Sequence, residues 1–177
     1  LYVDGTLYLS TPLGHVIALD AGTGRPRWIF DGKSPRDAGY GDFASRGVSM
    51  WQRGNDRRIF VATIDARLIA LNAETGQPIQ GFGNRGTIDL RQGLRIAPTG
   101  FADYEVTSPP AVVGDTIVVG SAIQDGSRTT EPSGEVRGFD AVTGKKKWSW
   151  DPIPQDPTTP AARTWNNGAA QRTGASN

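Results

Sequence analysis

Short apolar runs rich in β-branched residues recur along the chain in pairs. The first members of the three pairs read TLYLSTP, RIFVATI and TIVVGSA, at residues 6–12, 58–64 and 116–122. The second members read HVIALD, RLIALN and EVRGFD, at residues 15–20, 67–72 and 135–140. Runs of this length, bounded by Gly, Asp and Pro, favour short strands over helices. Each pair therefore predicts two strands closed by a turn.

A phrase of eleven residues overlaps the end of each pair. It occurs twice and a weakened third time, as ALDAGTGRPRW, ALNAETGQPIQ and GFDAVTGKKKW, at residues 18–28, 70–80 and 138–148. The shared element is Asp or Asn, then Ala, a free position, Thr and Gly. An Asp or Asn side chain can bond the backbone two residues on, and Gly accepts positive φ, so the element predicts a turn. A third strand, RPRWIFD or KKKWSWD, follows it in the outer two copies.

A fourth strand is suggested before the second and third units, by VSMWQR at 48–53 and PPAVVGD at 109–115. The phrase recurs after 52 and then 68 residues, so one supersecondary unit repeats with insertions of variable length. Repeated four-stranded units with an aromatic residue at a fixed position are typical of β-propeller blades. We therefore predict an all-β fold, a β-propeller fragment of about three four-stranded blades. Residues 1–177 are expected to form one partial propeller domain that continues beyond both ends of the chain, since a closed propeller needs more blades.

Trp28 and Trp148 end the outer two phrases, and the middle phrase has Gln80 at that position. A Trp at a fixed place in each repeat is expected to pack between neighbouring blades while its N–H finds a partner. We favour this packing role over a ligand-binding one. At Gln80 the contact between blades is predicted to be made differently.

Composition narrows the function classes. The chain has 19 Lys and Arg against 18 Asp and Glu, a net charge of +1, which exerts no long-range attraction on nucleic acid or anionic lipid. It has no cysteine, so the sequence holds neither a disulfide nor a thiolate metal site. Gly- and Pro-rich connectors separate the units, and functional residues are expected on such loops. These connectors run over residues 31–41, 81–104, 125–134 and 151–174.

With these segments in view, the chain resembles the quinoprotein dehydrogenases, which are large eight-bladed periplasmic propellers that bind pyrroloquinoline quinone (PQQ). The repeated phrase is similar to the tryptophan-docking motif of that family. Further matches are TPLGHVIALD, SRGVSMW, RLIALNAETGQPIQGFGNRGTIDL, TSPPAVVGDTIVVGSA and PSGEVRGFDAVTGKKKWSWDP. The last of these and the stretch from RLIALNAETG to GTIDL most resemble the membrane-bound glucose dehydrogenase branch. The chain would cover the N-terminal part of the catalytic propeller.

The resemblance implies two polar contacts to the cofactor. Arg46 matches an arginine directed at the carboxylate and carbonyl side of the quinone, a role that suits a planar, permanently charged fork. Thr107 matches a threonine whose hydroxyl bonds a cofactor carboxylate. From the residues alone, Arg46 also fits an exposed arginine at a strand entry, and Thr107 a turn-forming residue before Pro109.

Three further positions are implied by the same resemblance. Ser121 and Ala122 match a strand end where small residues let the chain approach the flat cofactor, although tight packing against the next blade would produce the same sequence. Asp125 falls where the family places a carboxylate that binds the divalent cation, Ca²⁺ or Mg²⁺, beside the quinone. An Asp-Gly turn with Gly126 is the alternative. The catalytic aspartate and the tryptophan that stacks on the quinone are expected beyond Asn177.

The implied function is oxidation of an aldose, polyol or other alcohol with PQQ as electron acceptor, assisted by the cation. A quinone or a cytochrome would then take the electrons, and the whole protein would be periplasmic, with a membrane anchor outside this chain. The alcohol dehydrogenases of the family carry adjacent cysteines that this chain lacks, which favours the sugar or polyol side. The main alternative is a non-enzymatic scaffold resembling the outer-membrane assembly lipoproteins that share the docking repeats. A sugar-binding propeller lectin is a more distant one.

Overall fold

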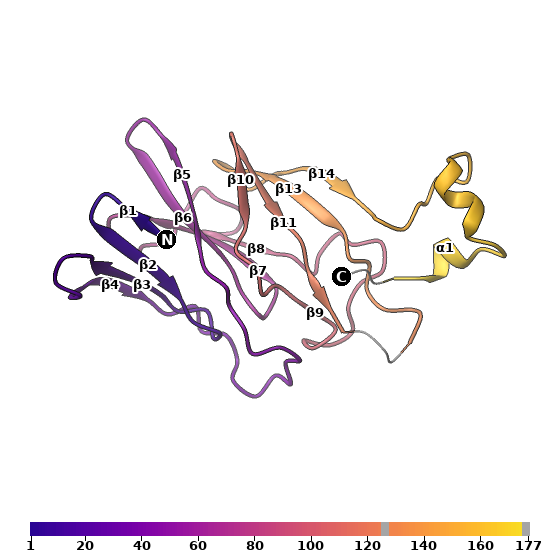
Figure 1. The fold of residues 1–177 in the computed structure, drawn as a ribbon, viewed down its shortest axis with the longest axis horizontal. Helices are drawn as coiled ribbons and strands as arrows, with labels where there is room; N and C mark the ends of the chain where they lie inside the picture. Colours follow the sequence, from indigo (N-terminus) through magenta and orange to yellow (C-terminus); the bar gives the residue numbers. More distant parts are fainter. Residues whose placement is uncertain (125–127, 175–177) are drawn as a thin grey trace.

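Three four-stranded antiparallel sheets and one two-stranded sheet make up the protein, as a computed structural model that describes residues 1–124 and 128–174 (Figure 1). The first sheet contains β1 (Tyr2–Val3), β2 (Thr6–Ser10), β3 (Val16–Asp20) and β4 (Pro26–Phe30). The second contains β5 (Ser49–Arg53), β6 (Asp56–Ala62), β7 (Arg67–Asn72) and β8 (Thr87–Asp89). The third contains β10 (Ala111–Val113), β11 (Thr116–Val119), β13 (Val136–Asp140) and β14 (Lys146–Trp150). The short sheet pairs β9 (Tyr104–Glu105) with β12 (Ala122–Ile123).

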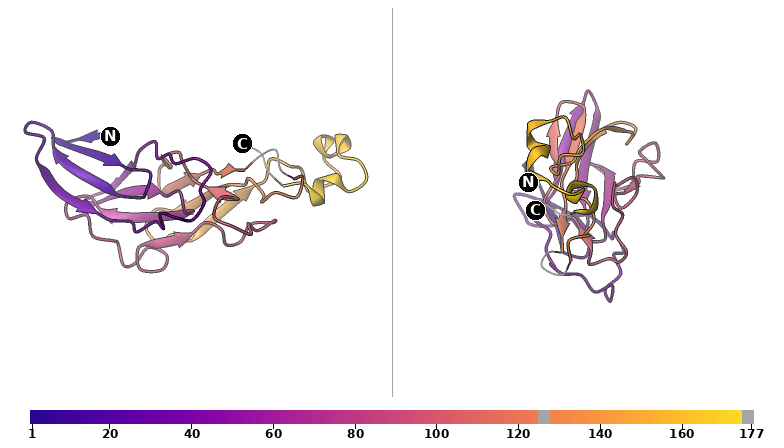
Figure 2. Two further views of the ribbon diagram at one scale, coloured as in Figure 1. Left: turned by 90° about the horizontal axis from the view of Figure 1, so that it is seen from below. Right: turned by 90° about the vertical axis from the view of Figure 1, so that its right-hand side faces the viewer.

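The three large sheets succeed one another along the molecule, as seen from two directions (Figures 1 and 2). Two apolar cores lie between them. One joins the first sheet to the second through Tyr8, Val16, Ile59 and Ile69, all nearly inaccessible to solvent. The other joins the second to the third around Phe60, and each core supplies a large buried apolar surface for stability. The predicted propeller blades are confirmed.

The repeated Asp/Asn-Ala-x-Thr-Gly element forms the same turn in all three blades. In the first, Asp20 Oδ1 accepts hydrogen bonds from the backbone N–H (2.9 Å) and the hydroxyl (2.8 Å) of Thr23. Asn72 and Asp140 bind Thr75 and Thr143 in the same way. The Gly that closes each turn has a φ of 70–75°, a conformation that other residues adopt only with strain.

The outer strand of the middle blade differs from the expected pattern. Residues 81–104 were predicted as a connector, yet they contain β8 and the first residue of β9. Pro78 makes only an isolated bridge with Leu71, and the chain then loops out before β8 returns to pair Ile88 with Leu68. The equivalent Pro26 begins the continuous strand β4 of the first blade, so the break follows from the Gly-rich insertion after Pro78 and not from the proline itself. The outer strand of this blade is therefore split by the loop 80–86.

Trp28 joins the first blade to the second, as its repeated position predicts. Its Nε1 donates to the carbonyl oxygen of Ala73 at 3.0 Å, and the Tyr8 hydroxyl donates to the same oxygen at 3.1 Å. The indole ring lies over Gly76, where an added Cβ would come within 2.6 Å of Trp28 Cε3. The Asn-Ala-x-Thr-Gly turn of the second blade thus packs against this ring, and only glycine fits beneath the ring.

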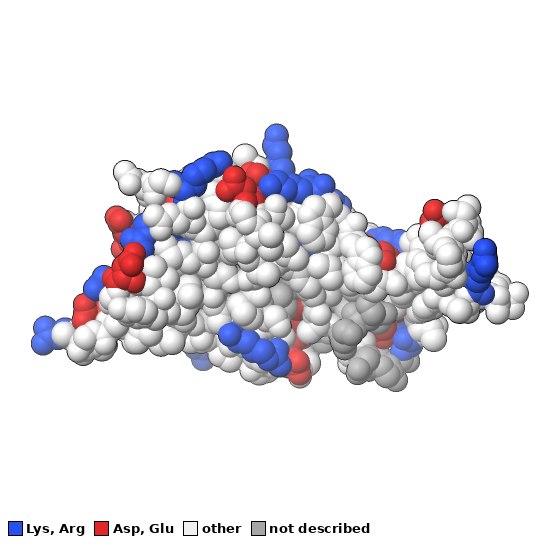
Figure 3. Space-filling view, turned by 45° about the horizontal axis from the view of Figure 1, so that its top comes forward, with Lys and Arg blue, Asp and Glu red and all other residues white. Residues whose placement is uncertain are grey.

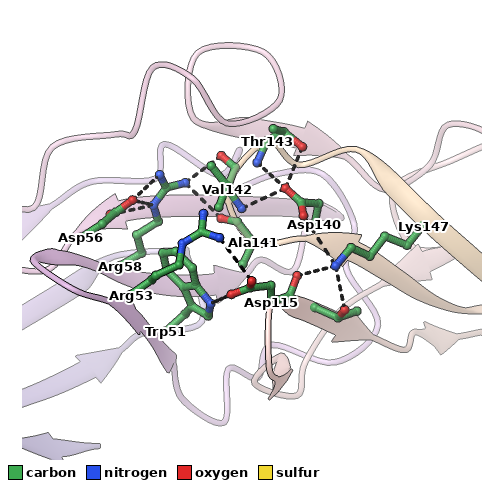
Figure 4. A network of polar contacts seen from close by, with 11 residues as sticks. Trp51, Arg53, Asp56, Arg58, Asp115, Asp140, Ala141, Val142, Thr143 and Lys147 are labelled. Atoms are coloured by element: carbon green, nitrogen blue, oxygen red, sulfur yellow. Dashed lines mark hydrogen bonds and ion pairs between the residues drawn. The ribbon is translucent and has the colours of Figure 1, made fainter.

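The second blade reaches the third by other means, as expected from Gln80. Arg58 Nη1 donates to the carbonyl oxygens of Ala141 (3.0 Å) and Val142 (2.8 Å), while Asp56 holds the other side of the guanidinium (Figure 4). The N–H of Gly83, in the inserted loop, donates to the carbonyl of Thr143 at 2.9 Å. An arginine and a loop therefore take the place of the tryptophan.

Short helices occur only near the C-terminal end of the described residues, where the connector 151–174 contains a 3₁₀ helix (Pro160–Thr164) and α1 (Ala169–Arg172). They project beyond the third sheet (Figures 1 and 2). Among residues 1–124 and 128–174, no helix has the length and apolar character needed to cross a membrane. On the face drawn in Figure 3, basic and acidic side chains lie next to one another, in keeping with the net charge of +1.

Candidate functional site

A pocket of about 570 Å³ lies at the end of the sheets where β5 and β10 begin and β11 ends. Its walls come from three segments far apart in sequence, 41–46, 102–107 and 121–124. The antiparallel order of the blades brings these segments together, because strand starts and strand ends alternate along each edge. Four residues expected to contact the cofactor line this one pocket, namely Arg46, Thr107, Ser121 and Ala122.

Arg46 and Thr107 are in direct contact. The guanidinium Nη1 donates to the Thr107 hydroxyl, and the backbone N–H of Arg46 donates to the Thr107 carbonyl at 2.9 Å. Thr107 is buried, whereas Arg46 is exposed to the open side of the pocket. The segment is fixed on either side of Arg46, since Ser45 Oγ donates to Ser10 Oγ at 2.8 Å and Ser49 Oγ donates to the Pro110 carbonyl. Arg46 therefore presents a positive charge to the pocket from an anchored backbone.

Ser121 and Ala122 lie where β11 ends and β12 begins. Ser121 Oγ is buried, and in the described part of the chain it has no hydrogen-bond partner of normal geometry. Burial raises the pKa of the neighbouring Tyr104, an effect that Arg137 and Ser121 oppose. Asp125, the expected cation ligand, lies outside the described residues.

Glu105 lines the same pocket and was not expected from the sequence. It lies in β9, is 2% exposed, and accepts hydrogen bonds from the backbone N–H groups of Gly41 and Asp42. Burial raises the pKa of its carboxyl, and the hydrogen bonds oppose that rise. A two-residue strand inside a long connector is too short to show alternation, so the sequence offers no pattern that marks this residue as inward-facing.

The residues present fit a flat, acidic cofactor. A positive charge and a buried hydroxyl can meet a carboxylate, and the buried Ser121 Oγ adds a further polar atom. The described residues offer fewer ligands for a cation than for an acidic cofactor. Within 1–124 and 128–174, no three His, Cys, Asp or Glu side chains gather to hold a metal ion.

Residues 1–177 match the family described as the β-propeller domain of glucose, ethanol and alcohol dehydrogenases that use PQQ. The chain belongs to this quinoprotein dehydrogenase family. The resemblance noted from the sequence is confirmed, and the non-enzymatic scaffold is not favoured.

Quinoprotein relatives of known identity align with most of the chain. The quinoprotein glucose dehydrogenase of Escherichia coli K12 is 36% identical over 166 residues, which cover 88% of this chain and 21% of that protein. The quinate/shikimate dehydrogenase (quinone) of Acinetobacter baylyi is 36% identical over 176 residues, 89% of this chain and 22% of that protein. The chain therefore spans about a fifth of the length of these quinoproteins.

A solved quinoprotein structure supports the same fold. The quinohemoprotein alcohol dehydrogenase ADHIIG of Pseudomonas putida HK5 superposes with a TM-score of 0.73 and 31% identity. The match covers 99% of this chain and 24% of that one. The three blades therefore correspond to part of a quinoprotein propeller.

Proposed function

We propose that these residues are three blades of the partial catalytic propeller of a PQQ-dependent dehydrogenase that oxidises an aldose, a polyol or another alcohol. One observation carries the proposal. Arg46, Thr107, Ser121 and Ala122 come from three distant segments and meet in one pocket of about 570 Å³. A scaffold propeller has no need of such a pocket lined by a charged side chain and buried hydroxyl groups.

In this proposal Arg46 and Thr107 bind the acidic side of the quinone. The guanidinium offers several donors in one plane, and its contact with Thr107 holds that plane in place. A bound quinone would supply the acceptor for one hydride equivalent, that is two electrons and a proton, from the alcohol carbon. In this arrangement Arg46 would hold a fixed positive charge close to the negative charge that develops on reduction, and would lower the barrier without reorganisation.

Ser121 and Ala122 form the wall against which the flat ring system lies. Their small side chains permit close approach, and Ser121 Oγ has a hydrogen bond to offer. Asp125 follows this wall by three residues and would supply one oxygen ligand to Ca²⁺ or Mg²⁺. The cation would polarise the reactive carbonyl of the quinone as a Lewis acid.

The setting of the whole protein is proposed from the relatives. We infer a periplasmic enzyme, anchored through a segment outside this chain, that passes electrons to a quinone or a cytochrome. In support, the name of the Acinetobacter relative includes the word quinone, and the Pseudomonas relative is a quinohemoprotein. Glucose, quinate or shikimate, and glycerol appear in the names of relatives, so a small polyhydroxylated substrate is proposed.

The test uses the full-length protein, stripped of cofactor and metal and then titrated with PQQ in the presence of Ca²⁺. The expected result is a saturable difference spectrum and dye-linked oxidation of an aldose or polyol. Arg46→Ala should weaken PQQ binding by about 10- to 100-fold, the loss expected for a charge-assisted hydrogen-bond pair. Arg25→Ala, an exposed turn arginine, is the matched control. Absence of any spectral change in the wild-type protein would refute the proposal.

A further inference from the structure

Glu105 is the most enclosed charged residue that lines the pocket. Its Oε1 accepts the backbone N–H of Gly41 at 2.6 Å, and its Oε2 accepts that of Asp42 at 3.2 Å. A single carboxylate thus receives two consecutive N–H groups from a chain segment 63 and 64 residues away. Charge-assisted bonds of this kind are about twice as strong as neutral ones.

The segment that Glu105 holds leads directly to Arg46. Residues 41–44 form no regular strand, so no sheet ladder fixes their path. Apart from the Glu105 bonds, the approach to Arg46 is secured by the Ser45 hydroxyl and by the bond from Arg46 N–H to the Thr107 carbonyl. Glu105 therefore restrains the chain four to five residues before the guanidinium.

Glu105 also belongs to the opposite wall of the pocket. It lies opposite Ala122 in the β9–β12 ladder, and it precedes Thr107 by two residues. One residue thus connects the Arg46 segment, through its side chain, with the Ser121–Ala122 wall, through its backbone.

Other roles for this carboxylate fit the geometry less well. Each of its oxygens already accepts a backbone N–H, so the carboxylate is held by the protein backbone and is not a free base or a free cation ligand. A negative charge beside an acidic cofactor also disfavours binding unless it is neutralised by donors. The structure is therefore best explained by a carboxylate that organises backbone.

We propose that Glu105 is a positioning residue for the cofactor site, one that sets the separation of the Arg46 segment from the Ser121–Ala122 wall. The inference rests on the proposed function, because it takes the pocket as the PQQ site. Glu105 does not touch the cofactor in this proposal. It acts through the N–H groups of Gly41 and Asp42, and hence through Arg46.

The experiment compares Glu105→Gln with Glu135→Gln in the full-length protein. Glu135 is a matched control, since it is 5% exposed and also accepts a backbone N–H, that of Arg95 at 2.8 Å, but does not line the pocket. Hydrogen exchange of residues 40–48 is measured before PQQ is added. PQQ affinity is then measured by titration at saturating Ca²⁺, and thermal unfolding reports general stability.

In Glu105→Gln, exchange at Gly41 and Asp42 should quicken and PQQ affinity should fall roughly tenfold. Glu135→Gln should lower the unfolding temperature to a similar degree and leave PQQ affinity unchanged. Equal affinity losses in the two variants, or none in Glu105→Gln, would overturn the inference and leave the proposed function standing. Unprotected Gly41 and Asp42 amides in the wild-type protein would overturn it even if the variant fails to fold. A wild-type protein that binds no PQQ would overturn both proposals.

Discussion

Arg58 donates to the carbonyl oxygen of Ala141 at 3.0 Å, and Trp28 donates to the carbonyl oxygen of Ala73 at the same distance. The two acceptors occupy the same position in the docking turns of successive blades. The acceptor is thus constant while the donor changes from an indole to a guanidinium. What the repeat preserves is a carbonyl that must be satisfied at each interface, because a buried unpaired acceptor is costly.

Arg58→Lys should lower the free energy of unfolding by about 2 kcal/mol, because a compact ammonium cannot reproduce the planar guanidinium, which reaches Asp56 on one side and two carbonyl oxygens on the other. Arg58 is 6% exposed and lies over the Trp51 ring, so the lost packing adds to the lost hydrogen bonds. Urea unfolding of the full-length protein measures the effect. Arg57→Lys is the control, since its partner Asp4 is largely exposed and such pairs contribute about 0–1 kcal/mol. Equal losses in both variants would contradict the docking role of Arg58.

Gly76→Ala should destabilise the protein by more than the backbone strain of a positive φ alone. Its φ of 70° strains any other residue by about 1 kcal/mol, and the new Cβ would meet the Trp28 ring at 2.6 Å. Forcing the ring away adds about 1–3 kcal/mol. The expected total of about 2–4 kcal/mol is measured by chemical unfolding.

Gly54→Ala separates the two contributions. Gly54 has a φ of 59° at a hairpin tip, and nothing lies within 4 Å of a Cβ built there. This variant should therefore show only the backbone strain. Combining Gly76→Ala with Trp28→Ala should remove the clash. The loss of unfolding free energy in the double variant should therefore be smaller than the sum of the losses in the two single variants. Strict additivity would mean that the ring and the glycine do not interact.

The sequence predicted the blades well because their signals are local. β-Branched runs and the Asp/Asn-Ala-x-Thr-Gly turn depend on neighbouring residues, and the structure has strands at every run. β8 was missed because Thr87–Asp89 is three residues long and follows a loop of Gly and Arg. Its pairing with β7 depends on a loop that folds back on the sheet, and such a loop leaves no periodic pattern in the sequence.

The site was predicted less completely, and for a different reason. Arg46 and Thr107 were singled out by resemblance to a family, because they are separated by 61 positions in the sequence and no local pattern reveals their contact. Glu105 had neither a motif nor a periodic position. The role proposed for it rests on hydrogen bonds from the N–H groups of Gly41 and Asp42, and a contact with backbone N–H groups is visible only in the folded chain.

Asp103 should make the protein sensitive to acid. Burial alone would raise the pKa of the Asp103 carboxyl. Hydrogen bonds from Thr99, Arg128 and Gly100 outweigh this effect and lower the pKa from 3.8 to about 2. A depressed carboxyl pKa gives stability that is complete above pH 3.8 and lost as the pH falls toward 2. Between pH 5 and pH 2, the free energy of unfolding of the wild-type protein should fall by about 1–2 kcal/mol more than that of Asp103→Asn, after allowance for the partly exposed Arg128. Unfolding curves across this range test it, and parallel losses would contradict it.

Thr107→Val should weaken PQQ binding while the fold persists. Thr107 is 6% exposed, and its hydroxyl accepts the Arg46 guanidinium, so valine fills the space but leaves that N–H without its partner. Arg46 is then free to turn toward solvent, and PQQ affinity in the full-length protein should fall about 3- to 10-fold. Thr107→Ser keeps the hydroxyl and should retain most of the affinity. If the valine and serine variants bind PQQ equally well, the Thr107 hydroxyl does not orient Arg46, and the guanidinium is held by its backbone alone.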